Sequence, residues 1–120
     1  DALVFVHGIG LGPAPYADFL AACADADTPI VALELAAFSQ RAFPRMPPSP
    51  DRFAELLDAA LARLGISRAV LAGHSLGSTF CHYYARRDRT RSRRVAALCL
   101  LDPVACLLHH STTTSEFVYT

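Results

Sequence analysis

A serine bracketed by two glycines, in the pentapeptide Gly73-His74-Ser75-Leu76-Gly77, is the segment best suited to chemistry. It follows the apolar run 69–72 and precedes residues with helical spacing, so a strand is expected to turn directly into a helix at the serine. At such a turn, side chains two positions before and after the serine would collide with the neighbouring strand and helix, which accounts for both glycines. The hydroxyl would lie at a helix N-terminus, where developing negative charge is stabilised. The alternative is a serine that only caps a helix after an unrelated turn.

A second glycine-rich segment, Val6-His7-Gly8-Ile9-Gly10-Leu11-Gly12, follows the first apolar run. Its three alternating glycines would let backbone N–H groups approach a ligand closely. The spacing does not match the dinucleotide fingerprint G-x-G-x-x-G, and no acidic ribose ligand follows. A loop that supplies one donor of an oxyanion hole fits better, the other donor being the N–H of the residue after Ser75. We expect His7 to brace this loop rather than to act as the catalytic base.

Four short apolar runs indicate the strands that would position these motifs, at about residues 2–6, 30–35, 68–73 and 95–101. The runs are continuous rather than alternating, which is typical of strands buried on both faces of a parallel sheet. Three segments with helical spacing separate them. The alternation predicts an α/β fold, a mostly parallel sheet with flanking helices.

The expected helices run from about Tyr16 to Cys23, from Phe53 to Leu64, and from Leu76 onward. The middle one has Ser49 as N-cap, Pro50 at its first position and Gly65 as its stop. The residues whose spacing defines the three helices are Tyr16, Phe19, Leu20, Cys23, Phe53, Leu56, Leu57, Ala60, Leu61, Leu64, Leu76, Phe80, Tyr83 and Arg87.

Composition narrows the classes of function. An apolar fraction of 52% excludes disorder, and a net charge of zero gives no general attraction to nucleic acid or acidic membranes. Six arginines within 86–94 are interpreted as a solvated helix end, not a phosphate-binding patch. The longest apolar stretch, 95–108, is shorter than the about 20 residues of a membrane span, and no signal peptide is visible.

The four cysteines form no metal-binding spacing and have apolar neighbours, so we expect buried, reduced thiols and a cytoplasmic protein without metal or cofactor. They are Cys23, Cys81, Cys99 and Cys106.

The two glycine motifs, in this order and at this separation, resemble the α/β-hydrolase fold family over the entire chain. The resemblance implies a partial domain over residues 1–120, running from the family's third strand to just past its sixth, with the cap and C-terminal strands missing. It implies Ser75 as the nucleophile and the amides of Ile9 and Leu76 as the oxyanion hole. The residues that would support the elbow and the loop are His7, Gly8, Gly10, Gly73, His74 and Gly77.

Asp102 is the candidate for the catalytic acid. It ends the expected strand after the one that carries the serine, and the pancreatic-type lipases of the family carry their acid there. Most members carry it one strand later. The alternative is that Asp102 caps the turn into Pro103.

The catalytic base is expected beyond residue 120, since the family places its histidine after the last strand. His74 should point away from Ser75, and His82 lies in the middle of a helix. His109 and His110 either swing back toward the serine or begin a lid.

Together the motifs predict a serine hydrolase that cleaves a small-molecule acyl ester or thioester through an acyl-enzyme. Two alternatives stay open: an acyltransferase or lyase on the same fold, or a non-catalytic relative that binds a small apolar ligand or a partner protein. A downstream histidine would distinguish an enzyme from a binder. The 120-residue chain itself is expected to be inactive, because without a base the serine hydroxyl stays protonated.

Overall fold

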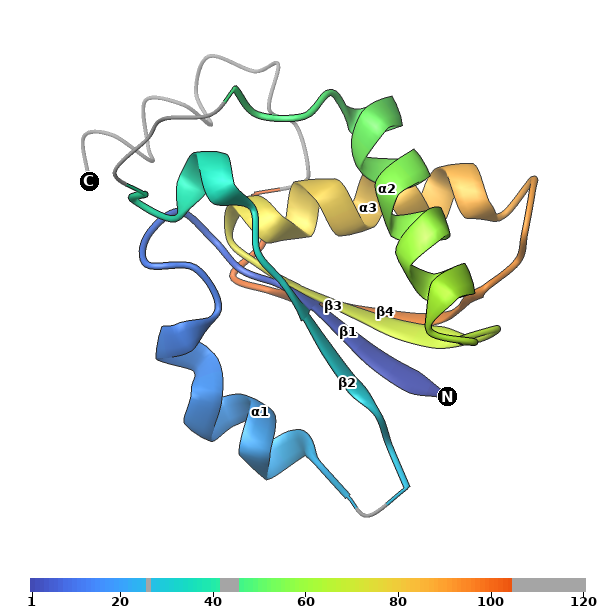
Figure 1. Cartoon of the computed structure of the whole chain (residues 1–120), viewed down its shortest axis with the longest axis horizontal. Helices are drawn as coiled ribbons and strands as arrows, with labels where there is room; N and C mark the ends of the chain where they lie inside the picture. Colours follow the sequence, from blue (N-terminus) through green and yellow to red (C-terminus); the bar gives the residue numbers. More distant parts are fainter. Residues whose placement is uncertain (26, 42–45, 105–120) are drawn as a thin grey trace.

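The computed structural model describes residues 1–25, 27–41 and 46–104. The strands are β1 (Ala2–Val6), β2 (Ile30–Leu33), β3 (Ala69–His74) and β4 (Val95–Leu101). The helices are α1 (Ala17–Cys23), α2 (Pro50–Arg63) and α3 (Leu76–Asp88), with short 3₁₀ helices η1 (Ala14–Tyr16) and η2 (Ala36–Phe38). Strands and helices alternate along the chain as expected (Figure 1), and β2 ends two residues before its expected boundary.

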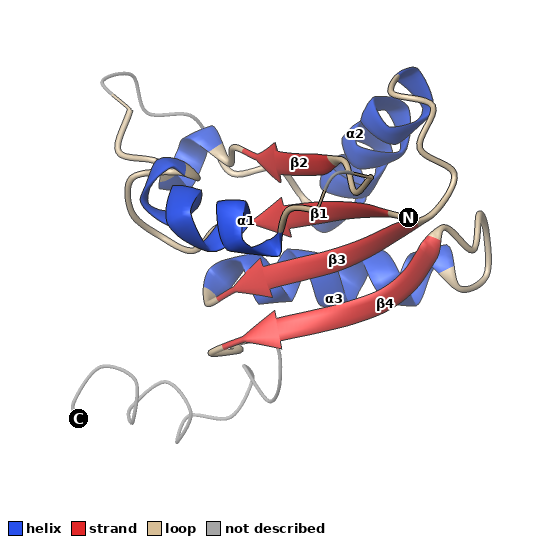
Figure 2. Ribbon diagram, turned by 90° about the horizontal axis from the view of Figure 1, so that it is seen from below, coloured by secondary structure: helices blue, strands red, loops and turns tan. Residues whose placement is uncertain are grey.

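The four strands form one parallel sheet in the order β2-β1-β3-β4 (Figure 2). Val4 of β1 pairs with Val31 on one side and with Leu71 on the other. Parallel neighbours need a crossover connection, and here a helix lies in each of the three connections. As a result the carboxyl ends of all four strands meet at one edge, where the two glycine motifs follow β1 and β3.

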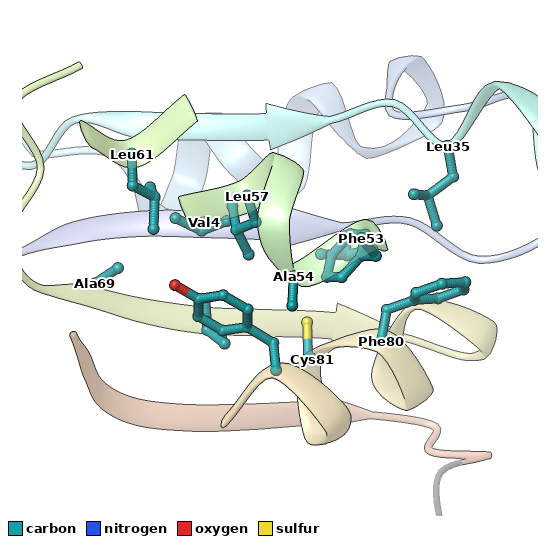
Figure 3. Packing of buried hydrophobic residues seen from close by; sticks show 12 residues of the cluster. Val4, Leu35, Phe53, Ala54, Leu57, Leu61, Ala69, Phe80 and Cys81 are labelled. Atoms are coloured by element: carbon teal, nitrogen blue, oxygen red, sulfur yellow. The ribbon is translucent and has the colours of Figure 1, made fainter. Parts of the chain in front are cut away.

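Alternate residues of the strands point to opposite faces of the sheet, and the two faces bury different clusters. Val4, Val6 and Leu71 belong to the larger cluster, which α2 and α3 cover (Figures 1 and 3). Phe5 and Ala72 belong to a smaller cluster on the face that carries α1. The strands that position the motifs are therefore packed from both sides, but unequally.

The helices begin and end where the sequence indicates, with a correction to their buried faces. Ser49 caps α2 by accepting a hydrogen bond from the Arg52 amide, as expected. Leu56 of α2 and Leu64, its C-cap residue, are exposed although their spacing places them on the apolar stripe. In α3 the buried tyrosine is Tyr84 rather than Tyr83, beside the buried Phe80. In α2 the apolar stripe predicted from spacing is wider than the buried face, and in α3 the buried face is displaced from the predicted one.

Burial on both faces is wrong for β4, four of whose seven residues are exposed. It is an edge strand, and among its described residues only Leu101 packs against the cluster on the α1-side face. The expectation of buried cysteines is correct for one of the three described cysteines and wrong for the other two. Cys81 is buried in the larger cluster, whereas Cys23 and Cys99 are exposed on the sparsely covered side, and Cys106 lies outside the described residues.

The arginine-rich segment is the end of α3 and the following turn, and it is largely exposed as predicted. Two of its members instead make intramolecular contacts. Arg87 Nη1 donates to the Asp51 carbonyl oxygen at 3.0 Å, and Arg94 Nη1 donates to the Ile66 carbonyl at the same distance. Among the described residues, no helix combines the length and the apolar character needed to cross a bilayer.

Candidate active site

Ser75 occupies the single residue between β3 and α3, the position that the glycine pattern predicts. Its φ is 49° and its ψ is −121°, a backbone conformation that L-residues rarely adopt. A conformation of this kind costs on the order of 1–3 kcal/mol and persists only where the surroundings enforce it. The strain is therefore an observed property of the elbow, not an inference from its sequence.

Gly73 and Gly77 supply the space that this turn requires. A Cβ atom on Gly73 would lie 2.7 Å from the Gly77 carbonyl oxygen, and one on Gly77 would lie 2.6 Å from the His7 carbonyl oxygen and closer still to that of Val6. These neighbours are backbone atoms, which cannot rotate away. The two glycines are thus explained by the contact of α3 with β1 and β3.

The elbow is tied to the end of β4 through its backbone and one buried hydroxyl. The Ser75 amide donates to the Leu101 carbonyl at 3.0 Å. The Ser78 hydroxyl, fully buried, donates to the Ser75 carbonyl at 2.6 Å and accepts from the Val104 amide at 3.0 Å. Ser78 was not predicted as a site residue, because a serine inside a helix has no distinctive local sequence pattern.

The loop after β1 lies against the elbow, at the same edge of the sheet. A Cβ atom on Gly8 would lie 3.0 Å from the Ser75 Cβ and 3.2 Å from His74 Nδ1, so glycine permits this approach. Within the part of the chain that the structure describes, the amides of Ile9 and Leu76 donate no hydrogen bond. No described residue therefore competes for these two amides.

His7 is completely buried and joins this loop to the segment that follows β2. Its Nδ1 lies 2.5 Å from the Gly8 carbonyl oxygen, and its Nε2 accepts from the Leu35 amide at 2.9 Å. One nitrogen faces an acceptor and the other a donor, which assigns the neutral tautomer with the proton on Nδ1. Ser39 lies beside Nε2 and donates to the Leu35 carbonyl at 2.8 Å. His7 is placed as a brace.

His74 is held by Tyr16, whose spacing in the sequence predicts only a place on the apolar stripe of a helix. Its Nδ1 lies 2.8 Å from the hydroxyl of Tyr16, and the two rings are 5.5 Å apart. The Gly8 amide donates to the same hydroxyl at 3.4 Å. His74 is thus engaged on the side of the loop.

Asp102 follows β4 directly, with φ 45° and an exposed side chain. The hydrogen bond from the Ser75 amide to Leu101 places the Asp102 backbone next to the elbow. His82 lies within α3, and His109 and His110 lie outside the described residues. In the described ranges, no histidine hydrogen-bonds Ser75.

Two ionisable groups on the elements around the site have shifted pKa values. The Arg41 guanidinium, which donates to Glu34, holds the pKa of that carboxyl below its usual range, so Glu34 after β2 is ionised. Burial raises the pKa of the Cys81 thiol to about 12. Over residues 1–104, apart from the undescribed 26 and 42–45, no group of three or more His, Cys, Asp or Glu side chains could hold a metal ion.

Comparison with known proteins gives one family. A family model described as the alpha/beta hydrolase fold matches residues 1–118. Among curated proteins, the chain is 31% identical over 108 residues to a Mycobacterium phage D29 protein that carries the provisional name non-heme haloperoxidase. That match covers 90% of this chain and 38% of the phage protein.

Solved structures give the same fold. A protein from Pseudomonas aeruginosa PAO1, described as a hydrolytic enzyme, matches with a TM-score of 0.71 and 27% identity over 86% of this chain and 32% of its own. Naproxen esterase (carboxylesterase NP) from Bacillus subtilis matches with a TM-score of 0.71 over 85% of this chain and 35% of its own, but at 20% identity it supports the fold alone. The chain spans a third to two fifths of the length of these relatives.

Proposed function

This chain belongs to the α/β-hydrolase fold family, and from that premise we propose that Ser75 is the nucleophile of a hydrolase acting on acyl esters or thioesters. The observation that carries the proposal is the strained elbow, with Ser75 at φ 49° between β3 and α3. A serine needed only as a helix cap has no reason to adopt this conformation. The elbow instead lifts the hydroxyl to the sheet edge, beside the loop after β1.

The reaction would begin with attack of the Ser75 hydroxyl oxygen on the substrate carbonyl carbon while a base takes the hydroxyl proton. The carbonyl electron pair moves to oxygen, and the amides of Ile9 and Leu76 would donate to that oxyanion. Collapse expels the alcohol or thiol, which takes the proton from the base. Water then repeats the attack on the acyl-enzyme, releasing the carboxylic acid and the serine.

The base in this proposal is a histidine outside the described residues, because His7 and His74 are engaged elsewhere. Asp102 is the candidate to orient it, since Asp102 adjoins the elbow through Leu101. A turn-capping role for Asp102 is the competing assignment. The substitution Asp102→Asn distinguishes the two roles. If Asp102 is catalytic, the substitution should lower kcat by about 10⁴, whereas if it only caps the turn, the substitution should change mainly the stability.

A second candidate concerns the acyl acceptor, and the phage relative's name favours it. If hydrogen peroxide replaced water in the second step, the product would be a peracid, which oxidises halide to hypohalous acid and is itself reduced to the carboxylic acid. The same acyl-enzyme passed to an alcohol or amine would make an acyltransferase. Product analysis with each acceptor present separates these activities.

The test compares the full-length gene product with its Ser75→Ala variant, using short p-nitrophenyl esters and a fluorophosphonate that labels activated serines. Ser67→Ala is the matched control, because Ser67 is exposed and precedes β3. We expect Ser75→Ala to lower kcat by about a millionfold and to abolish labelling, and Ser67→Ala to change neither. Undiminished turnover in Ser75→Ala would contradict the proposal.

A further inference from the structure

The hydroxyl of Tyr16 joins the loop after β1 to the end of β3, which is distant in sequence. It lies 2.8 Å from His74 Nδ1 at the end of β3, and it accepts a hydrogen bond from the Gly8 amide in the loop after β1 at 3.4 Å. Tyr16 itself ends η1. The same hydroxyl therefore touches the residue before Ser75 and the residue before Ile9.

The ring that carries this hydroxyl is held by packing against β1 and the smaller cluster. Its centroid lies 4.8 Å from that of Phe5, which is completely buried in β1, and it packs in the smaller cluster with Leu20 and Ala72. A tyrosine has only two side-chain torsions, so a ring held this way orients its hydroxyl at little further entropic cost. The hydroxyl position is thus determined by the sheet, not by the loop.

The loop, by contrast, depends on few contacts near Ile9. The Ile9 side chain is 69% exposed and that of Leu11 is 65% exposed, so neither packs the loop down. Among the described residues, the polar contacts that hold the loop are those of His7, the Gly10 amide to the Phe38 carbonyl at 2.9 Å, and the Gly8 amide to Tyr16. Of these, the one to Tyr16 also reaches the elbow.

We propose that Tyr16 is a positioning residue of the acyl-transfer site, whose hydroxyl bridges the Gly8 amide and the His74 imidazole and so fixes the loop amide of Ile9 relative to Ser75. The inference rests on the proposed function. Oxyanion donors act at about 3 Å, and a displacement of about 1 Å costs up to a hundredfold in rate. Since the bridge sets donor placement rather than substrate binding, its loss should reduce kcat with little change in KM.

Tyr16→Phe removes only the bridging oxygen, and Tyr83→Phe is the matched control. The Tyr83 hydroxyl donates to Asp51 at 2.9 Å on the exposed side of α3, away from the elbow. In the full-length protein, we expect Tyr16→Phe to lower kcat about tenfold with KM within about twofold, and Tyr83→Phe to leave both unchanged. Equal kcat in the two variants, with Ser75→Ala inactive, would overturn the inference while leaving the proposed function standing.

A double-mutant cycle isolates the bridge from general effects on packing. His74→Asn keeps a hydrogen-bonding group near the Nδ1 position and should retain most of the activity, whereas His74→Leu removes it and should match Tyr16→Phe. The double variant Tyr16→Phe/His74→Leu should be no worse than either single variant, because both remove the same contact. Additive losses would overturn the proposal.

NMR measurements, which need no catalytic turnover, test the Tyr16 bridge independently of the proposed hydrolase function. In Tyr16→Phe, the Gly8 amide should exchange with solvent faster and the His74 imidazole nitrogen resonances should shift, while Tyr83→Phe leaves both unchanged. If Ser75→Ala retained activity, the proposed function would fail, yet these NMR signals would still report the bridge. Unaltered Gly8 exchange and His74 resonances in Tyr16→Phe would contradict the bridge itself.

Discussion

The two faces of the sheet are covered very differently. Among the described residues, α2 and α3 cover a cluster of twelve buried residues on one face (Figures 1 and 3), whereas the cluster on the α1 face has three buried residues. Beside α1 lies an open groove of about 440 Å³, lined by Leu3, Phe19, Val70 and Cys99 among others. The candidate site depends on both faces. The elbow is continuous with α3 on one face, and the ring of Tyr16 packs in the smaller cluster on the other.

This contrast teaches where each part of the site gets its rigidity. Ser78, Phe80 and Cys81 of α3 lie buried behind the elbow, so the strained conformation of Ser75 is enforced by a dense core. The loop after β1 has fewer contacts and is held mainly by polar groups. We therefore expect substitutions on the densely covered face to lower the unfolding free energy more than substitutions on the α1 face.

The largest effect is expected for Gly77→Ala, at the contact between the two layers. A Cβ there meets backbone oxygens of Val6 and His7, and backbone can yield only by moving α3 away from β1. The variant should lose about 4 kcal/mol or more of unfolding free energy, or fail to fold. Gly65→Ala is the control, because a Cβ there meets nothing within 4 Å and only φ 69° opposes it. Similar losses in the two variants by urea denaturation would contradict this account.

A smaller difference should separate matched leucines on the two faces. Leu61 is fully buried between α2 and the sheet, so Leu61→Ala should cost about 3 kcal/mol through lost burial and a residual cavity. Leu20 lies in the three-residue cluster, where neighbours have space to collapse, so Leu20→Ala should cost about 1.5 kcal/mol. Equal costs by chemical denaturation would mean that the thin face is supported as well as the dense one.

The dense face should also make stability fall at high pH. Burial raises the pKa of the Cys81 thiol from its ordinary value of 9.0 to about 12. Above pH 9 the unfolded state therefore loses this proton before the folded state does, and unfolding becomes more favourable until the pH passes the folded pKa. Between pH 8 and pH 10 the wild type should lose about 1.4 kcal/mol more than Cys81→Ala. Identical pH dependence in the two proteins would show that Cys81 is not desolvated.

The smallest effect concerns helix ends. Ser49 caps α2 through the Arg52 amide, whereas α1 has no side-chain cap. Ser49→Ala should cost about 1 kcal/mol and speed amide exchange in the first turn of α2, leaving α1 unchanged. A loss of protection that spread to α1 would indicate that the two faces unfold together rather than independently.

The sequence predicted most of the backbone because its signals are local. Continuous apolar runs located the strands, and Ser49, Pro50 and Gly65 marked the limits of α2. The position of Ser75 at the elbow followed from the glycines, because their spacing reflects a steric requirement of one turn.

The errors and omissions arise where a residue's surroundings come from distant segments. The run 95–101 resembles a doubly buried strand, yet β4 is exposed because it is a sheet edge. Cys23 and Cys99 have apolar neighbours in sequence but lie on the open face. The role of the Tyr16 hydroxyl was invisible because it depends on meeting His74. A helical stripe predicts a ring in a core and gives no indication of what its oxygen will touch.

The contact between Tyr16 and His74 joins side chains 58 positions apart, which has a consequence for how homologous genes diverge. If either residue is substituted, the other loses its hydrogen-bond partner, so we expect positions 16 and 74 to covary among homologues. Homologues that lose the imidazole should also lose the hydroxyl. In a chimaera whose crossover falls between the two positions, residues 16 and 74 would come from different parent proteins, and the contact between loop and elbow could be lost.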